Sequence, residues 1–391
     1  MTDADVVVIG AGIHGAGVAQ AAVAAGHSVL LLEKRAPGHG TSSRSSKLIH
    51  GGLRYLESGQ FRLVRESLHE RTLMLRNAPD LVHLVPFFIP VYRATRRRPW
   101  VLRLGLAMYS VLGGFGPGTR FGAIPRSEWD RLDGLEHRGL ETVLRYYDGQ
   151  TDDAALTRAV LRSAVELGAT AAIPADFTSA ELEPGGATVT YAENGRVQTC
   201  RARVIVNAAG PWANSVLERF APALPPAAVE LVQGTHIALP GRISQGIYYV
   251  ESPHDGRVVF VMPWQDRTLV GTTETPFHGN PDDVRPLAAE IDYLLHIVRH
   301  YFPRYRGRDL DVLQSFAGLR VLPAARATAF GRSRETLYAQ DRKDRPRVLT
   351  IYGGKLTGWR AAAEQVMQRI APSLPLTRAR ADTRTIKLKA D

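Results

Sequence analysis

The chain has 391 residues, of which 45% are apolar and 22% are charged, and its formal net charge is +11. This composition excludes a disordered chain, and the length suggests two or three domains. No run of about 20 apolar residues is present, so we expect no membrane-spanning helix. The single cysteine, Cys200, excludes an internal disulfide. Because the N-terminus also shows no signal-peptide pattern, we expect a cytoplasmic protein.

The first elements of the chain predict a strand, a helix and a second strand. Residues 5–9 are a short apolar, β-branched run that ends at Gly10, as in a buried parallel strand. An alanine-rich helical stretch follows over about 16–25. Residues 28–33 form a second apolar run, with Glu33 at its end. This order is typical of a βαβ unit with an acidic residue after its second strand.

A glycine pattern lies between the first strand and the helix. Gly10 permits the tight turn, Gly12 lets a diphosphate approach the backbone, and Gly15 lets helix and strand pack closely. The N–H groups at the helix start face the phosphates. Glu33, 18 positions after Gly15, has the spacing of a carboxylate that binds ribose hydroxyls. The unit predicts a dinucleotide site, although NAD and FAD both use it.

Later segments predict returns to the same sheet. They are the apolar strand 203–210 and the strand 347–352, which is followed by a helix from about 357 to 370. Between them, 76–147 and 216–312 are richer in aromatic residues, prolines and alternating strand patterns. We therefore predict an α/β (α+β) fold in which a substrate domain is inserted twice into a nucleotide-binding domain. The nucleotide-binding domain comprises 1–75, 148–215 and 313–372, the substrate domain 76–147 and 216–312, and a basic tail 373–391.

A longer motif distinguishes FAD from NAD as the cofactor. Residues 41–57 read TSSRSSKLIHGGLRYLE. This block closely resembles the FAD-dependent glycerol-3-phosphate dehydrogenases of the D-amino-acid-oxidase-like flavoprotein superfamily. Further matching blocks follow in order at 210–212, 233–236, 271–273, 317–320 and 353–357. The resemblance implies a Rossmann-like FAD-binding domain and a mixed-sheet substrate domain. The family typically continues into a further helical domain, so this sequence resembles a short form without it.

The matching residues suit FAD. Hydroxyl groups and backbone donors in 41–46 can hydrogen-bond the diphosphate, and Gly51 and Gly52 let the backbone run close beneath a flat ring. Gly353 and Gly354 lead into a helix whose positive end would favour the anionic reduced flavin. The predicted cofactor-binding residues are Gly10, Gly12, Ile13, His14, Gly15, Glu33, Lys34, Thr41, Ser42, Ser45, Ser46, Lys47, Leu48, His50, Gly51, Gly52, Gly210, Trp212, Gly318, Gly354, Lys355, Leu356 and Thr357.

Several cations in or beside the matching blocks indicate an anionic substrate, since arginine and lysine suit the capture of a phosphate. The resemblance implies oxidation of the secondary alcohol of sn-glycerol 3-phosphate, or of a similar hydroxyalkyl phosphate or phosphonate, by hydride transfer to flavin N5. It places seven residues around the substrate: Arg54, Tyr55, His236, Thr273, Arg320, Arg334 and Lys355.

Histidine is the most common proton acceptor near neutral pH. His236 is the first candidate for the base or hydroxyl anchor, and His50 is the second. Arg320 belongs to a cationic pocket that would stabilise alkoxide character. Four departures from the family's pattern lie close to this pocket or to the flavin. Glu274 stands where the family usually has Asp, His14 where it usually has Asn, 321–323 where it usually has Arg-Pro-Leu, and 358–359 where it usually has Thr-Tyr.

Other functions stay open at this point. An amine or amino-acid oxidase of the same superfamily would need residues that bind the carboxylate group of its substrate. We predict no metal site, and no nucleic-acid partner because no recognition motif accompanies the charge. The cluster 96–98 precedes an apolar stretch, 101–112. This segment is either an amphipathic helix on the anionic inner face of the cell membrane or a substrate-domain helix with its polar face in water. Quinone, oxygen and a soluble carrier remain alternative electron acceptors.

Overall fold

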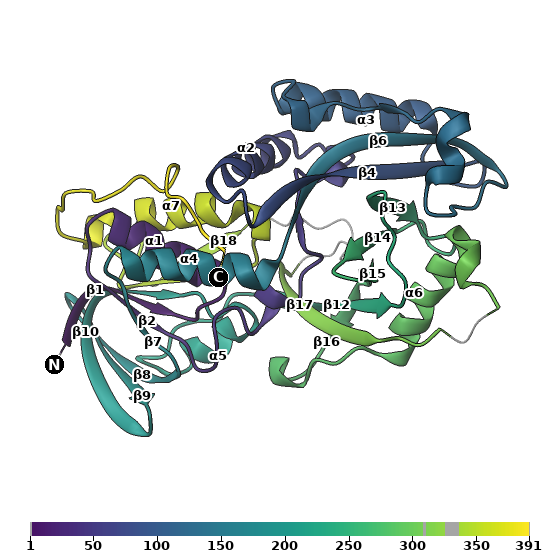
Figure 1. Cartoon of the computed structure of the whole chain (residues 1–391). Helices are drawn as coiled ribbons and strands as arrows, with labels where there is room; N and C mark the ends of the chain where they lie inside the picture. Colours follow the sequence, from purple (N-terminus) through teal and green to yellow (C-terminus); the bar gives the residue numbers. More distant parts are fainter. Residues whose placement is uncertain (1, 308–309, 325–335, 391) are drawn as a thin grey trace.

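The computed structural model describes residues 2–307, 310–324 and 336–390, which form two mixed β-sheets flanked by helices (Figure 1). In the first sheet the strands follow the order β11-β8-β9-β10-β1-β2-β7, while β19 pairs with β10 and β18 with β19. Their bounds are β1 Thr2–Ile9, β2 Val29–Leu32, β7 Thr170–Ala172, β8 Ala175–Glu183, β9 Gly186–Glu193, β10 Arg196–Asn207, β11 Phe220–Ala221, β18 Leu337–Gln340 and β19 Val348–Tyr352.

The βαβ unit predicted at the N-terminus is present. Strand β1 pairs in parallel with β2, and helix α1 (Ile13–Ala24) connects them. The predicted returns to this sheet are also confirmed, because β10 runs parallel to β1 and β19 runs parallel to β10. Since successive side chains of a strand face opposite sides, Val6 and Val8 pack with the helices while Val7 and Ile9 belong to the core of the other face.

Three helices cover the first face of this sheet. Helix α1 lies between α4 (Asp153–Glu166) and α7 (Trp359–Ile370), as Figure 1 shows. Eleven of the twelve residues of α1 are buried, which explains why its sequence is rich in alanine and glycine and shows no polar face. The short helix α5 (Ala213–Leu217) contributes Val216 and Leu217 to the core of the opposite face.

The second sheet follows the order β16-β12-β15-β14-β13-β4-β6-β3, with β17 beside β12 and β5 beside β6. Helix α6 (Ala288–Tyr301) packs on one side, while α2 (Phe61–Asn77) and α3 (Pro99–Leu112) belong to the core of the other. The strand bounds are β3 Leu48–Ile49, β4 Val82–Tyr92, β5 Gly122–Ala123, β6 Leu140–Thr151, β12 Val229–Leu239, β13 Ile247–Glu251, β14 Val258–Trp264, β15 Arg267–Gly271, β16 Thr275–Phe277 and β17 Gln314–Pro323.

The two sheets modify the division into domains that the sequence predicts. Strand β17 pairs with β12 over its whole length and so belongs to the second sheet, although it falls within the predicted nucleotide-binding piece 313–372. Strand β3 pairs with β6 in the same sheet. We therefore propose a substrate domain that also includes β17, with the chain passing between the domains at 41–57, 151–153, 221–229 and near 324.

The basic tail packs against the C-terminal ends of α1 and α2. The Arg380 amide donates to the Ala24 carbonyl at the end of α1, and the Leu388 amide donates to the Asn77 carbonyl at the end of α2. The side-chain amide of Asn77 donates to the Arg384 carbonyl. Within the described residues, every helix is too short or too polar to cross a membrane.

Candidate active site

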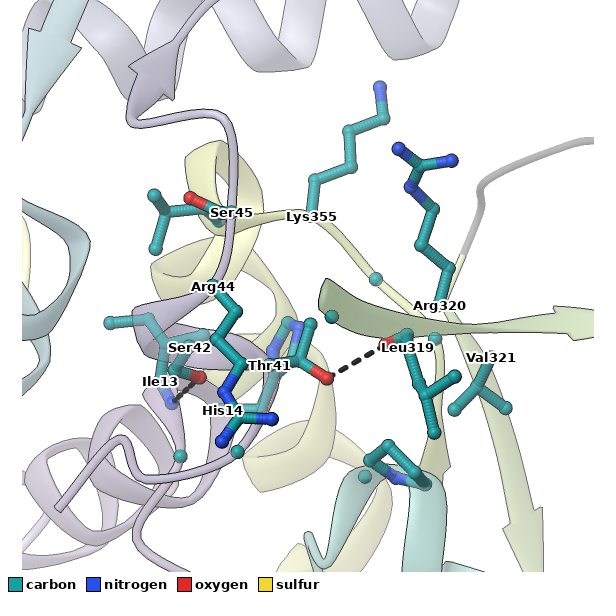
Figure 2. Close-up of a pocket in the computed structure, with 18 of the residues that line it drawn as sticks. Ile13, His14, Thr41, Ser42, Arg44, Ser45, Leu319, Arg320, Val321 and Lys355 are labelled. Carbon is teal, nitrogen blue, oxygen red and sulfur yellow. Dashed lines mark hydrogen bonds between the residues drawn. The ribbon is translucent and has the colours of Figure 1, made fainter. Parts of the chain in front are cut away.

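A cavity of about 400 Å³ is lined by residues of both sheets and of the loops between them. Figure 2 shows that Ile13, His14, Thr41, Ser42 and Arg44 lie on one part of its wall, while Arg320 and Lys355 lie on another. The same cavity is lined by the glycine turn and by the cationic residues predicted for the substrate. The site therefore combines a dinucleotide-binding end and a substrate end.

The glycine turn has the geometry that the sequence predicts. Gly10 has a φ of +99°, a conformation that favours glycine, and a Cβ there would lie 2.9 Å from the Ala208 carbonyl oxygen. A Cβ on Gly15 would lie 1.8 Å from the Gly10 carbonyl oxygen. A Cβ on Gly12 would have one heavy atom within 4 Å, the Ser42 hydroxyl oxygen at 3.2 Å. The first and third glycines therefore permit close packing, while the second leaves backbone exposed to the cavity.

Glu33 joins the turn to the second strand. Its Oε2 accepts a hydrogen bond from the Ala11 amide at 2.9 Å, and its Oε1 accepts one from the Arg35 amide at 2.8 Å. A carboxylate has about four acceptor positions, so both oxygens keep capacity for ribose hydroxyls. The position of Glu33 on the cavity wall agrees with the predicted role.

The serine-rich block is fixed at three points. The Ser42 hydroxyl accepts a hydrogen bond from the Ile13 amide at the start of α1, at 2.9 Å. The Thr41 hydroxyl donates to the Leu319 carbonyl of β17 at 2.7 Å (Figure 2). The Ser45 amide donates to Asp153 at the start of α4, at 2.9 Å. The block thus lies across the helix N-terminus that would face the diphosphate.

Most of the predicted site residues reach the cavity wall, but some do not. Gly15 and Gly51 are buried in the backbone packing, and the Gly51 amide donates to the Tyr109 hydroxyl at 2.8 Å. Lys47 is buried and forms an ion pair with Asp153. Arg334 lies outside the described residues. The predicted residues on the wall are Gly10, Gly12, Ile13, His14, Glu33, Lys34, Thr41, Ser42, Ser45, Ser46, Leu48, His50, Gly52, Arg54, Tyr55, Gly210, Trp212, His236, Gly318, Arg320, Gly354, Lys355, Leu356 and Thr357.

Thr273 also turns away from the cavity, and its neighbour Thr272 lies on the wall. The Thr273 hydroxyl donates to Glu290 at 2.7 Å and accepts a hydrogen bond from the Thr235 amide at 2.9 Å. The hydroxyl of Thr273 thus donates one hydrogen bond and accepts another inside the protein, so the structure does not support direct substrate binding by this side chain. Glu290 also accepts hydrogen bonds from Gln233, Thr235 and Thr275. Burial raises the pKa of Glu290, but the hydrogen bonds from Thr235, Thr273, Thr275 and the Leu287 amide outweigh it and hold the pKa below its ordinary value.

The structure also adds residues that the sequence reasoning missed. Arg44 stands within the serine-rich block and lies on the wall, and Arg257 reaches the wall from the start of β14. Tyr249 and Phe260 provide aromatic surface there. The clearest sequence signal was at Arg44, because it lies inside the most specific block. Tyr249 lies in β13, Phe260 lies in β14, and Arg257 directly precedes β14. Only the register of the sheet shows which side chains of these strands face the cavity.

The substrate end is strongly cationic. Lys355 Nζ lies 3.8 Å from the centroid of the Tyr55 ring, and the Arg54 guanidinium carbon lies 5.9 Å from it. Arg320 Nη1 lies 3.1 Å from Glu274 Oε1, and its Nη2 donates to the Thr272 hydroxyl at 3.2 Å. The cavity therefore has one wall with two cations around an aromatic ring and a second wall with an arginine held by a carboxylate.

The two histidine candidates have different surroundings. His236 is buried, its Nε2 lies 3.0 Å from the Ser46 hydroxyl, and its ring stacks on Phe316 with a centroid distance of 5.0 Å. Burial, together with the positive charges of Arg320 and Lys47, lowers the pKa of His236 from 6.5 to about 3. The ring is therefore neutral at neutral pH.

His50 is half-buried on the cavity wall. Its backbone amide donates to the Thr357 hydroxyl at 3.1 Å, and its ring lies edge-on to Phe260 at a centroid distance of 6.4 Å. Strand β3 and the segment after β19 thus hold the His50 backbone at the cavity wall.

Two buried ring nitrogens provide a further test of whether the cavity fits a dinucleotide. His14 Nδ1 and Trp212 Nε1 have no hydrogen-bond partner among the described residues, and both side chains line the cavity. Buried polar atoms are normally satisfied, so each is suited to a polar atom of a ligand. Burial lowers the pKa of His14 to about 4, which keeps its ring neutral. Together with the glycine turn and Glu33, these atoms fit an adenine dinucleotide.

Comparison with known proteins decides between the two cofactors. The sequence model of the family described as FAD dependent oxidoreductase (DAO) matches residues 5–363. The chain belongs to this family. Its cofactor is therefore FAD, as predicted, and the D-amino-acid-oxidase-like fold is confirmed. This FAD-dependent oxidoreductase would hold the diphosphate at the glycine turn and the flavin between the two sheets.

Relatives of this oxidoreductase include two bacterial dehydrogenases. D-erythritol 1-phosphate dehydrogenase of Brucella abortus is 39% identical over 378 residues, which are 95% of this chain and 74% of the relative. Aerobic glycerol-3-phosphate dehydrogenase of Escherichia coli is 36% identical, with the same coverage. The crystal structure of glycerol-3-phosphate dehydrogenase from Bacillus halodurans complexed with FAD has a TM-score of 0.73 and 27% identity, covering 99% of this chain and 68% of that one.

Proposed function

We propose that this FAD-dependent oxidoreductase oxidises the secondary alcohol of a hydroxyalkyl phosphate to a ketone. The observation that carries the proposal is the cationic substrate end, where Arg54, Lys355 and Arg320 line one cavity. A phosphate entering a partly desolvated pocket needs such compensation. The relatives that act on glycerol 3-phosphate and erythritol 1-phosphate support this substrate class. A phosphonate of similar shape would meet the same cations.

Bound FAD would supply the hydride acceptor, and the residues of the chain supply binding and proton handling. Arg54 and Lys355 would bind the phosphate, and Arg320 would stabilise alkoxide character at the reacting hydroxyl. We assign the proton acceptor to His50, which lines the cavity and is half-buried. His236 is less suited to this role, because its pKa of about 3 makes it a weak base. Its Nε2 instead holds the Ser46 hydroxyl.

A titration without oxygen tests the substrate class. Addition of sn-glycerol 3-phosphate or erythritol 1-phosphate to the yellow protein should bleach the visible absorbance of the oxidised flavin. Glycerol, erythritol and amino acids at the same concentration should leave it unchanged, because they lack the phosphate that the cations bind. Bleaching by amines or amino acids, and by none of the phosphates, would instead establish the alternative amine or amino-acid oxidase activity.

We further propose that helix α3 rests on an anionic lipid surface. The helix buries Leu102, Leu106 and Tyr109 and turns an apolar stripe to solvent, in which Trp100 is 68% and Leu104 61% exposed. The rest of the stripe consists of Val101, Met108, Val111 and Phe115. A substrate-domain helix would show water its polar face, so this arrangement favours the membrane alternative. Arg98, Arg103 and Arg120 are exposed nearby and complement anionic headgroups. Electrons would then pass to a membrane quinone.

Sedimentation with lipid vesicles tests this surface. The protein should bind vesicles that contain phosphatidylglycerol and should bind vesicles of phosphatidylcholine much more weakly. The double variant Trp100→Ser, Leu104→Ser should lose about tenfold or more in affinity, since two exposed apolar side chains no longer enter the interface. A matched pair, Val197→Ser and Leu376→Ser, removes exposed apolar groups elsewhere and should bind normally. Equal binding of both double variants would refute the surface, and self-association abolished by the α3 variant would show a second copy as its partner.

A further inference from the structure

Arg44 has an arrangement that the residues around it do not explain. It stands in the serine-rich block, its side chain is half-buried, and it lines the same cavity as Ile13, His14 and Ser42 (Figure 2). Among the described residues, its guanidinium makes a single long hydrogen bond, from Nη1 to the Ala317 carbonyl at 3.4 Å. Within the described part of the chain, no carboxylate forms an ion pair with it.

The nearest charges increase this imbalance. Burial lowers the pKa of Arg44, and the positive charges of Arg285 and Arg35 lower it further. Arg35 is compensated by Asp282, at 3.2 Å, which also lies 3.7 Å from Lys34. Arg44 has no equivalent partner among the described residues, so its charge is left to be balanced by something that enters the cavity. A partly buried cation without a counter-ion costs free energy that a bound anion would recover.

The position of Arg44 identifies the anion. The start of α1 carries a partial positive charge, but its Ile13 amide is already engaged by the Ser42 hydroxyl. The diphosphate of a dinucleotide carries two negative charges at this helix start. We propose that Arg44 is a binding residue for the FAD diphosphate and donates charge-assisted hydrogen bonds to it. This inference rests on the cofactor of the family and is independent of the substrate proposed above.

The test compares ligands that share parts of FAD, using the apoprotein and the variants Arg44→Ala, Arg44→Lys and Arg126→Ala. Binding of FAD is followed by quenching of its fluorescence, and binding of ADP and adenosine by calorimetry. Arg44→Ala should weaken FAD and ADP by about 10- to 100-fold, the effect of a lost charge-assisted hydrogen bond. Adenosine lacks the diphosphate and should bind the variant and the parent equally. The affinity for ADP should also become less sensitive to salt, because one charge contact is lost.

Two further variants control for charge and for structure. Arg44→Lys keeps the charge and should bind FAD and ADP with roughly one third of the parent affinity, because the lysine ammonium is a point charge without the planar fork of arginine. Arg126 is exposed on the surface away from the cavity wall, and Arg126→Ala should bind all three ligands normally. Removal of an uncompensated cation should leave the apoprotein melting temperature unchanged or higher. Unchanged ADP affinity in Arg44→Ala would overturn the proposal, as would an equal loss for ADP and adenosine.

Discussion

Replacement of Gly15 by alanine is expected to weaken FAD binding on the order of 100-fold. The new Cβ would lie 1.8 Å from the Gly10 carbonyl oxygen and 3.3 Å from the Ala208 Cβ, both of which belong to the turn region itself. Helix α1 would have to move away from β1 and β10, taking its N-terminus away from the diphosphate. Overpacking of this kind costs roughly 1–3 kcal/mol or more, so the affinity for FAD should fall on the order of 100-fold.

The measurement is the ratio of flavin to protein absorbance after purification, followed by the thermal unfolding midpoint of the apoprotein. Gly185→Ala is the matched control, because a Cβ at this exposed glycine would meet no heavy atom within 4 Å. The control should retain a full complement of FAD. A Gly15→Ala protein that holds FAD in equal amount would show that helix and strand can separate at no cost to the site.

Replacement of Arg320 by alanine is expected to lower kcat/KM for the preferred phosphate by about 10³-fold. The change removes a cation and also leaves the Glu274 carboxylate, formerly 3.1 Å from the guanidinium, on the wall where an anion must bind. Loss of one partner of a largely buried charge pair costs roughly 2–5 kcal/mol. Flavin reduction followed by stopped flow without oxygen gives this value, and the FAD content should be unchanged.

A double-mutant cycle separates the two parts of this effect. Glu274→Gln in the Arg320→Ala background removes the repulsion, so it should recover about tenfold of the lost kcat/KM. Arg320→Lys keeps the charge but loses the bidentate contact to Glu274 and Thr272, so its activity should be intermediate. If Arg320→Ala changed kcat/KM by less than about twofold, Arg320 would have no part in stabilising charge at the reacting hydroxyl.

The comparison of sequence and structure is clearest at the dinucleotide end. The strand, turn, helix and strand of the first 33 residues were predicted because each depends on neighbours close in sequence. The three glycines are required by contacts within this unit and with Ala208, and Glu33 closes it through the Ala11 amide. Local motifs of this kind carry their geometry with them, so cofactor class and fold followed from the sequence and its family resemblance.

The substrate end could not be predicted to the same degree. Successive residues of an extended chain face opposite sides, and the sequence alone did not show which of Thr272 and Thr273 faces the cavity. Burial of Glu290 from α6 decides it, because that carboxylate takes the Thr273 hydroxyl. Strand β17 likewise pairs with β12 across a long separation in sequence.

By itself, the sequence determined the FAD-binding unit and the set of cations available to a phosphate. Only the tertiary structure decided that His236 is a buried neutral ring, that Lys47 is neutralised by Asp153, and that Arg44 faces the cofactor cavity. The physical reason is that burial and charge compensation depend on residues distant in sequence. A side chain's type is fixed where it is encoded, but its protonation and its partners are fixed where the chain brings other groups against it.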